Sequence, residues 1–430
     1  MKQRFASLDA WLAWQERLHP STIDLGLERV ARVRAALGLK PFGCPVVTVG
    51  GTNGKGSCVA LLESILGAQG VRVGTFTSPH LNRYNERIHV AGREVTDREL
   101  MDAFERITDA RADVSLTFFE YNALAAFCVF ADAALDAIVL EVGLGGRLDA
   151  VNVIDADVAL LVSVGIDHVD WLGPTLEAIG REKAGIFRRG RPAVLGSSEM
   201  PKSVGESAEA IGAQLIEPPR DFHWSRSGPR WRWQGGVESH EDLPPPALGG
   251  AQQFDNAAAV LAVLESLSDR LPVTRDAIVH GLEAVRLPGR FQRISLSGVD
   301  WILDVAHNAD AAQTLARNLR DTPSAGRTLA VFGLLKDKDA RAIVNALQAC
   351  VDAWLLVDLA GERGLTGREL AQRAFAENRA GVDAVGSLSA ALEQARAAAR
   401  PGDRVAVFGS FHVVGPALEW LQLYSRAPEI

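Results

Sequence analysis

The chain has 430 residues, of which 47% are hydrophobic and 23% charged, and its formal net charge is −8 at pH 7. These values are ordinary for a globular protein, and the length suggests two or three domains. The net negative charge argues against a nucleic-acid partner, because general nucleic-acid binders carry a basic footprint. No apolar run reaches the length of a membrane span, the nearest being Ala123–Phe130, so we expect no membrane contact.

The cysteines and the first residues indicate where the protein works. The 4 cysteines are scattered, and none belongs to a Cys-x-x-Cys pair. This spacing argues against a disulfide framework or a structural zinc site and fits a reducing compartment. The opening sequence MKQRFASLDAWLAWQERLHP lacks the apolar core of a signal peptide. We therefore predict a cytoplasmic protein.

The first strongly patterned region is a glycine-rich turn between a strand and a helix. Val46–Val49 is typical of a buried strand, Gly50–Ser57 has the sequence GGTNGKGS, and Cys58–Leu66 is typical of a helix. Such a turn directs backbone N–H groups and a helix dipole at one spot, where a lysine adds a cation for phosphate. The pattern predicts ATP binding. The usual loop has Ser or Thr directly after the lysine, whereas Gly56 stands there, so another oxygen is expected to bind the metal.

Strands and helices then alternate as far as about Gly196, which predicts an α/β layered domain with a mostly parallel sheet. The expected strands are Val71–Phe76, Ala137–Val142 and Val158–Val164. The expected helices are Asp97–Ala110, which Thr96 and Glu99 cap, and Tyr121–Ala134.

A different pattern interrupts this alternation between Asp221 and Gly250, where tryptophans lie among Ser, Arg and Gly. We expect a small β excursion there, with the tryptophans in packing, followed by the helix that contains Asn256. Arg286–Arg290 is typical of a hinge, and α/β alternation resumes from about Ile294, which predicts a second, smaller domain. Its expected strands are Trp301–Val305, Thr328–Phe332, Ala353–Val357 and Val405–Phe408.

Polar residues follow several of these strands, at the sheet edge where open α/β folds bind ligands. Glu141 ends one strand, Ser78 follows another, and His168 follows a third. Near a phosphate loop the acid and the hydroxyl suit magnesium, which prefers hard oxygen ligands. Each also has a plain alternative: a strand-end acid that caps a turn, a Ser-Pro turn, and a structural histidine.

Lys183, late on the next predicted helix, has two interpretations. It is either a solvated lysine or a desolvated one that loses its proton readily. In the second case the neutral amine can react with carbon dioxide to form a metal-binding carbamate. In the second domain, His307 and Ser410 follow strand ends and would line a cleft if the domains face each other.

The motifs GTNGKGS, TSPHL, LTFFEY, EVGLGGRLDA, DHVDWLG, REKAGIF, LPGRFQ, DVAHN and GSFH occur in the order seen in folylpolyglutamate synthases. The chain resembles that family from Thr22 to Ser410. EVGLGGRLDA with REKAGI is the specific signature, since GTNGKGS alone also fits Mur ligases. The resemblance implies an ATPase domain over residues 1–288, with its β excursion near 221–250, and a Rossmann-like C-terminal domain over 289–430. One departure is Ala309, where related sequences often have proline.

The resemblance also implies roles for individual residues. The ATP-binding set is Thr52, Asn53, Gly54, Lys55, Gly56, Ser57, Asn256, Arg290 and Asp304. The metal-binding set is Ser78, Glu141, His168 and carbamylated Lys183. The substrate-binding set is Ile23, Asp24, Leu25, Thr117, Phe118, Phe119, Glu120, Leu148, Asp149, Ala150 and Ser410. The catalytic set is Lys55, His168, Lys183 and His307.

The activity that the resemblance implies is ATP-dependent ligation of L-glutamate to dihydropteroate and to folates, through an acyl phosphate. It implies two Mg²⁺ sites and a monomer, and it allows a monovalent cation as an additional cofactor. Two alternatives remain. A Mur-type ligase usually carries a full domain ahead of the phosphate loop, whereas 49 residues precede Gly50 here. A nucleotide-gated switch would have no need of Glu141, His168 and Lys183 together.

Overall fold

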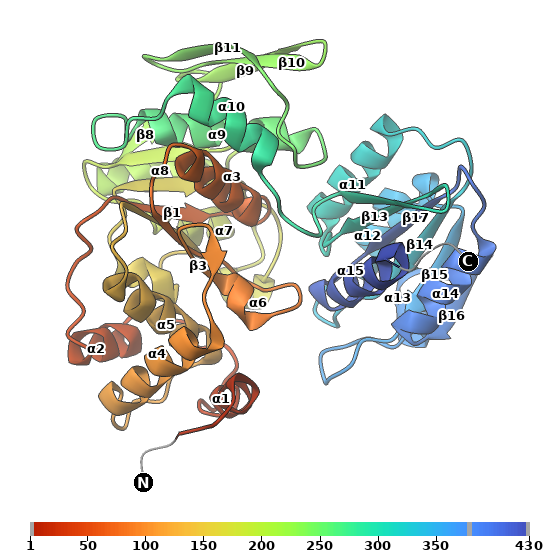
Figure 1. Cartoon of the computed structure of the whole chain (residues 1–430), viewed down its shortest axis with the longest axis horizontal. Helices are drawn as coiled ribbons and strands as arrows, with labels where there is room; N and C mark the ends of the chain where they lie inside the picture. Colours follow the sequence, from red (N-terminus) through yellow and green to blue (C-terminus); the bar gives the residue numbers. More distant parts are fainter. Residues whose placement is uncertain (1–3, 376–380, 427–430) are drawn as a thin grey trace. The chain divides into compact units, whose positions relative to one another are not determined.

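The computed structural model describes residues 4–375 and 381–426. The chain divides into two compact units (Figure 1). The first consists of Met1–Ala247 and Phe254–Val285, and the second of Leu248–Gln253 and Arg286–Ile430. The functional domain boundary at residues 288/289 stays a prediction.

An eight-stranded sheet organises the first unit, in the order β4-β3-β2-β5-β1-β6-β7-β8. The strands from β2 to β8 in this order run parallel, and β3 and β4 add antiparallel pairs at one edge. This confirms the mostly parallel sheet predicted from the sequence. The strands are β1 Val46–Gly50, β2 Val73–Phe76, β3 Ile88–Val90, β4 Arg93–Glu94, β5 Ala137–Glu141, β6 Val158–Leu161, β7 Pro192–Leu195 and β8 Gln214–Ile216.

Helices pack around this sheet, whose central strands are buried along their whole length. The helices are α1 Leu8–Gln15, α2 Glu28–Ala36, α3 Lys55–Ala68, α4 Asp97–Ala110, α5 Phe118–Asp132, α6 Val169–Leu172, α7 Leu176–Ala184, α8 Lys202–Ile211, α9 Gln252–Glu265 and α10 Arg275–Ala284, with 3-10 turns η1 Tyr84–Arg87 and η2 Ala150–Val153.

The bounds of several elements differ from the sequence-based expectation: β2 begins at Val73 rather than Val71, and α3 spans Lys55–Ala68 rather than Cys58–Leu66. The helix expected over Tyr121–Ala134 begins three residues earlier, because Thr117 and Glu120 form a capping box at its start. The strand expected to reach Val164 ends at Leu161, because the next residues leave the sheet and bind the glycine-rich loop. By contrast, α4 has the predicted bounds and the predicted capping box of Thr96 and Glu99.

A small antiparallel sheet, in the order β11-β10-β9, occupies the segment expected to form a β excursion. Its strands are β9 His223–Ser227, β10 Arg230–Gln234 and β11 Ser239–Leu243. Trp231 and Trp233 are buried, and their indole N–H groups donate to the Pro244 and Ala258 carbonyls at 2.7 and 3.1 Å. The prediction that these tryptophans serve packing is therefore confirmed.

The second unit is built on a six-stranded sheet in the order β12-β13-β17-β14-β15-β16, parallel except for the β12–β13 pair. Its strands are β12 Gln292–Leu296, β13 Val299–Asp304, β14 Thr328–Phe332, β15 Ala353–Val357, β16 Val382–Gly386 and β17 Arg404–Phe408. Its helices are α11 Ala309–Asp321, α12 Ala340–Leu347, η3 Gln348–Cys350, α13 Gly367–Ala374, α14 Leu388–Ala398 and α15 Phe411–Arg426. The two-unit α/β architecture predicted from the sequence is confirmed.

Candidate functional site

The glycine-rich loop joins β1 to α3, as the sequence predicts. Gly54 forms the N-cap of α3 in a left-handed conformation, with φ of 88°. A Cβ atom there would lie 2.7 Å from Val162 Cγ1 and 3.0 Å from the Asn256 Oδ1 atom. Only glycine fits, so the loop backbone can pass close to its neighbours and direct the first N–H groups of α3 to one spot. The same packing brings Asn256, predicted to bind ATP, to the loop from α9.

Residues that follow β6 hold this loop in shape. The Thr52 N–H donates to the Ser163 carbonyl at 2.9 Å, and the Asn53 N–H donates to the Ser163 hydroxyl at 3.0 Å. The Ser163 hydroxyl donates in turn to the Asn53 carbonyl at 2.9 Å, and the Gly165 N–H donates to the Thr52 hydroxyl at 2.9 Å. Sequence reasoning missed Ser163 and Gly165, although both follow a strand that neighbours β1.

The Lys55 ammonium lies over the loop. It donates to the Gly51 carbonyl at 2.9 Å and to the Thr52 carbonyl at 3.3 Å. A half-buried cation in this position is suited to bind the outer phosphates of a nucleotide. Ser57 is buried on α3, two residues after Lys55.

Two predicted metal ligands meet at the same edge of the sheet. Strands β2 and β5 are neighbours, so Ser78 and Glu141 leave the sheet side by side. The Ser78 N–H donates to Glu141 Oε2 at 3.1 Å, and Glu141 is 4% exposed. Their hydroxyl and carboxylate oxygens are the hard donors that Mg²⁺ prefers, so this pair fits the metal that the sequence predicts.

Lys183 is buried near the end of α7, with 5% of its surface exposed, so the solvated alternative is wrong. Desolvation by burial, with a further contribution from the positive charge of Lys55, lowers the pKa of Lys183 to about 7. The nearby Asp167 and Asp149 carboxylates oppose this shift without cancelling it. A neutral amine at physiological pH is what carbamate formation requires.

His168 caps α6 in a left-handed conformation, with φ of 53°. Its backbone N–H donates to the preceding Asp167 carboxylate at 2.8 Å. Among the residues that the structure describes, no three His, Cys, Asp or Glu side chains gather into a metal site. The metal-binding set that the sequence predicts therefore depends on a non-standard ligand, the carbamate of Lys183, together with Ser78.

The loop between Gly143 and Asp149 packs directly on α7. A Cβ atom at Gly146 would lie 2.7 Å from the Lys183 carbonyl oxygen, and Arg147 pairs with Glu182 at 2.9 Å. The two most specific motifs in the sequence are thus in contact.

Asp149 is 2% exposed, and its carboxylate accepts the Leu144 and Val151 N–H groups at 2.9 and 3.0 Å. Burial raises the pKa of Asp149 to about 6, although these backbone donors oppose the rise.

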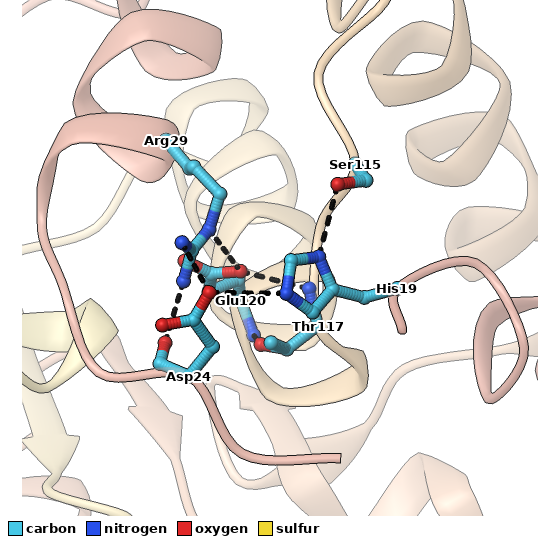
Figure 2. Close-up of polar contacts among 6 residues, drawn as sticks. All are labelled: His19, Asp24, Arg29, Ser115, Thr117 and Glu120. Atoms are coloured by element: carbon cyan, nitrogen blue, oxygen red, sulfur yellow. Dashed lines mark hydrogen bonds and ion pairs between the residues drawn. The ribbon is translucent and has the colours of Figure 1, made fainter. Parts of the chain in front are cut away.

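The segments predicted to bind the substrate also converge. A Cβ atom at Gly143 would lie 2.5 Å from the Phe119 ring, so the start of α5 packs on this loop. Asp24 and Glu120, both predicted site residues, are bridged by Arg29, which sequence reasoning missed (Figure 2). The separation of 91 residues between Arg29 and Glu120 leaves no local signal of this contact. The remaining predicted substrate residues in this unit are Ile23, Leu25, Thr117, Phe118, Leu148 and Ala150.

The second unit holds the other predicted residues at the carboxyl ends of its neighbouring strands β13 and β17. Asp304 accepts the Phe291 and Ala306 N–H groups, both at 2.8 Å, and burial raises its pKa. The His307 ring Nδ1 lies 2.8 Å from the Val305 carbonyl, and Ser410 is buried. The prediction that residues of this unit bind ATP and glutamate stays a prediction.

Comparisons with known proteins identify the family to which the chain belongs. The model of the Mur ligase middle domain matches residues 49–200, and that of the Mur ligase glutamate ligase domain matches residues 289–411. The dihydrofolate synthase/folylpolyglutamate synthase of Escherichia coli K12 is 44% identical over 97% of this chain and 96% of its own length. The chain belongs to this family.

Solved structures of family members share the fold. E. coli FolC in complex with DHPP and ADP has a TM-score of 0.93 and 43% identity, covering 99% of this chain and 100% of that one. A bifunctional folylpolyglutamate synthase/dihydrofolate synthase with Mn, AMPPNP and L-glutamate bound has a TM-score of 0.89 and 42% identity, covering 98% and 100%. In the described part of the chain, no helix is both long and apolar enough to cross a bilayer.

Proposed function

We propose that this protein ligates L-glutamate to dihydropteroate, giving dihydrofolate, and to the γ-carboxylate of folates. The observation that carries the proposal is the arrangement at one sheet edge, where Lys55 and its loop lie beside the Ser78–Glu141 pair. Family membership supports it, because the named relatives carry both activities in their names. The energy source is ATP, and the carboxyl group of the pterin substrate is the group activated.

Amide formation from a carboxylate needs activation, because its delocalised charge makes it a poor electrophile. A carboxylate oxygen attacks the γ-phosphorus of ATP, and the bond to the bridging oxygen of ADP breaks. The product is an acyl phosphate. The amine of L-glutamate then attacks the acyl carbon and loses a proton, and orthophosphate leaves with the oxygen that came from the carboxylate. His307 accepts the proton, with His168 as the alternative base if it does not bind the second Mg²⁺. Catalysis of the first step is largely positioning and electrostatics.

The charge that moves in the first step is stabilised by this chain's own groups. The Lys55 ammonium and the backbone N–H groups at the start of α3 bind the phosphates, Thr52 and Asn53 shape the loop around them, and Asn256 contacts the nucleotide from α9. Arg290 and Asp304, which belong to the second unit, are the remaining members of the proposed ATP-binding set. Ser78 and Glu141 hold one Mg²⁺, and His168 with carbamylated Lys183 holds a second. Bound Mg²⁺ supplies charge neutralisation at the phosphoryl oxygens. The proposal allows a monovalent cation as an additional cofactor without assigning ligands to it.

The substrate side of the proposal rests on the converging segments around Asp24, Glu120 and Asp149. These bind the pterin, while His307 and Ser410 bind the incoming glutamate. We also propose that the protein acts as a monomer and that it works in the cytoplasm; the scattered, free cysteines support the second of these proposals.

An isotope experiment tests the reaction. Dihydropteroate labelled with ¹⁸O in its carboxyl group is incubated with ATP, Mg²⁺, L-glutamate and the full-length protein, and the products are analysed by mass spectrometry. We expect ADP, dihydrofolate and orthophosphate that contains one labelled oxygen. Unlabelled orthophosphate, or release of AMP and pyrophosphate, would refute the acyl phosphate. A parallel reaction with tetrahydrofolate tests the second activity, and a nucleotide-linked muramyl precursor serves as the negative control.

A further inference from the structure

A chain of polar contacts links two segments of the predicted pterin site (Figure 2). Arg29, at the start of α2, donates from Nη1 to Asp24 Oδ2 at 2.7 Å and from Nη2 to the Asp24 carbonyl at 2.5 Å. Its Nε donates to both Glu120 oxygens, at 3.0 and 3.2 Å. One guanidinium therefore binds a main-chain carbonyl, a partly exposed carboxylate and a buried carboxylate at once.

Each of the two carboxylates, of Asp24 and Glu120, has a further hydrogen-bond partner besides Arg29. The His19 ring lies 3.1 Å from Asp24 Oδ2 through Nε2 and 2.9 Å from the Ser115 hydroxyl through Nδ1. Glu120, whose side chain is 4% exposed, accepts the Thr117 N–H at 2.8 Å. The network thus runs from the segment before α2 to the start of α5, and Arg29 binds a carboxylate in each of the two segments.

The surrounding helices do not need Arg29 to hold their places. Helix α2 is fixed by Val30 and Val33, which are both 0% exposed. Helix α5 has its own capping box of Thr117 and Glu120. The segment of residues 23–26 has no regular secondary structure. Arg29 binds both its Asp24 carbonyl and its Asp24 carboxylate, whereas His19 binds the carboxylate alone. A forked, planar cation suits this task, whereas lysine is a point charge.

We propose that Arg29 is a positioning residue for the pterin substrate. It fixes the Asp24 segment against the start of α5 and so preforms the surface on which the pterin binds, while contacting neither ATP nor the reacting carboxyl group. The inference rests on the proposed function, because it assigns these segments to the pterin. It predicts a selective effect: loss of the arginine weakens pterin binding and leaves the affinities for ATP and glutamate in place.

The test compares Arg29→Gln and Arg29→Lys with Arg32→Gln in the full-length protein. Arg32 is a matched control, since it lies one turn along α2 and makes a solvent-exposed ion pair with Asp113. We measure kcat, the KM values for dihydropteroate, ATP and glutamate, the Kd for dihydropteroate, and the melting temperature. Arg29→Gln should raise the KM and Kd for dihydropteroate at least about tenfold, with the other KM values within about twofold. Arg29→Lys should recover part of the loss, and Arg32→Gln should match the wild type.

Other outcomes overturn the inference. An unchanged dihydropteroate KM in Arg29→Gln, or an equal rise in all three KM values with a lower melting temperature, would show a merely structural arginine. If Arg29→Gln does not fold, Arg29→Lys serves instead: lysine keeps the positive charge but lacks the planar fork that binds both carboxylates, and it must show a selective rise in the dihydropteroate KM. A wild-type protein that does not ligate glutamate to dihydropteroate would overturn the proposed function itself, which separates the two failures.

Discussion

The burial of Lys183 determines how large a fraction of its amine is neutral and can react with carbon dioxide. Burial, helped by the charge of Lys55, lowers the pKa of this amine to about 7 from its ordinary 10.5. At about pH 8 the neutral fraction is then roughly 90%, against roughly 0.3% for an ordinary lysine. Only the neutral amine attacks carbon dioxide, giving a carbamate and releasing one proton. The reactive fraction of Lys183 is therefore raised roughly 300-fold.

The sign of the pH dependence follows from this equilibrium. Above the lowered pKa the amine is neutral and carbamate forms, whereas below it the protonated amine does not react. With ¹³C-labelled bicarbonate, we expect one protein carbamate signal by ¹³C NMR in the wild type at about pH 8 and its loss as the pH falls through about 7. Degassed, bicarbonate-free buffer should lower ligase activity, and added bicarbonate should restore it.

Substitution assigns the signal to the residue. Lys183→Met should lack the carbamate signal and lose ligase activity, while remaining folded, because methionine fills the buried space without a charge to desolvate. Lys202→Met, at an exposed lysine that starts α8, is the control and should keep both signal and activity. A wild-type protein with no carbamate signal at about pH 8, or a Lys183→Met variant with normal turnover, would refute the reasoning.

Three further changes have expected outcomes. Lys55→Ala should lower kcat at least about a hundredfold with an unchanged circular dichroism spectrum, because the ammonium is half-buried on its own loop and donates to two carbonyls there; normal turnover would contradict the phosphate-loop assignment. Gly54→Ala should weaken ATP binding, measured by calorimetry, and cost about 1–3 kcal/mol of stability, because its φ is 88° and a valine would lie 2.7 Å from the new Cβ. The Arg93 contact, helped by the helix cap, lowers the pKa of Glu99 from 4.5 to about 2, so this stabilisation is present above pH 4.5 and is lost as pH falls toward 2. Since the pair is exposed, Glu99→Gln should lower the free energy of unfolding by only about 0.5–1 kcal/mol at neutral pH. Between pH 4.5 and 2, the free energy of unfolding measured in urea should fall less steeply in the variant than in the wild type. An equally steep fall in both proteins would contradict this reasoning.

Local signals predicted the regular elements well. Helix α4 has its predicted bounds because the Thr96–Glu99 capping box is written within four consecutive residues. Strands β14 and β15 also have their predicted bounds, because continuous apolar runs between polar turns are typical of buried parallel strands. Helix α5 begins three residues before its predicted start, because the apolar run that predicts the helix begins only after the Thr117–Glu120 capping box.

Contacts between distant segments were out of reach of such signals. Whether Lys183 is solvated or buried depends on the Gly143–Asp149 loop. This loop is distant from Lys183 in the sequence but packs on α7 in the fold. The Arg29 network joins residues 91 positions apart, and nothing around Arg29 distinguishes it from Arg32 on the same helix. The two arginines differ only in what the fold brings opposite them.

The strand order explains why the candidate site could be predicted in part at all. Along the chain, the glycine-rich loop, Ser78, Glu141 and Ser163 are far apart, but they follow β1, β2, β5 and β6, which are consecutive in the sheet as β2-β5-β1-β6. Because these strands are parallel, every residue that follows one of them emerges at the same edge. Ser78 and Glu141 therefore meet through sheet geometry alone, whereas Lys183 comes from a helix and its position depends on side-chain packing. The two predicted metal ligands that the sheet positions, Ser78 and Glu141, should consequently tolerate surface changes on α7 that would displace the lysine.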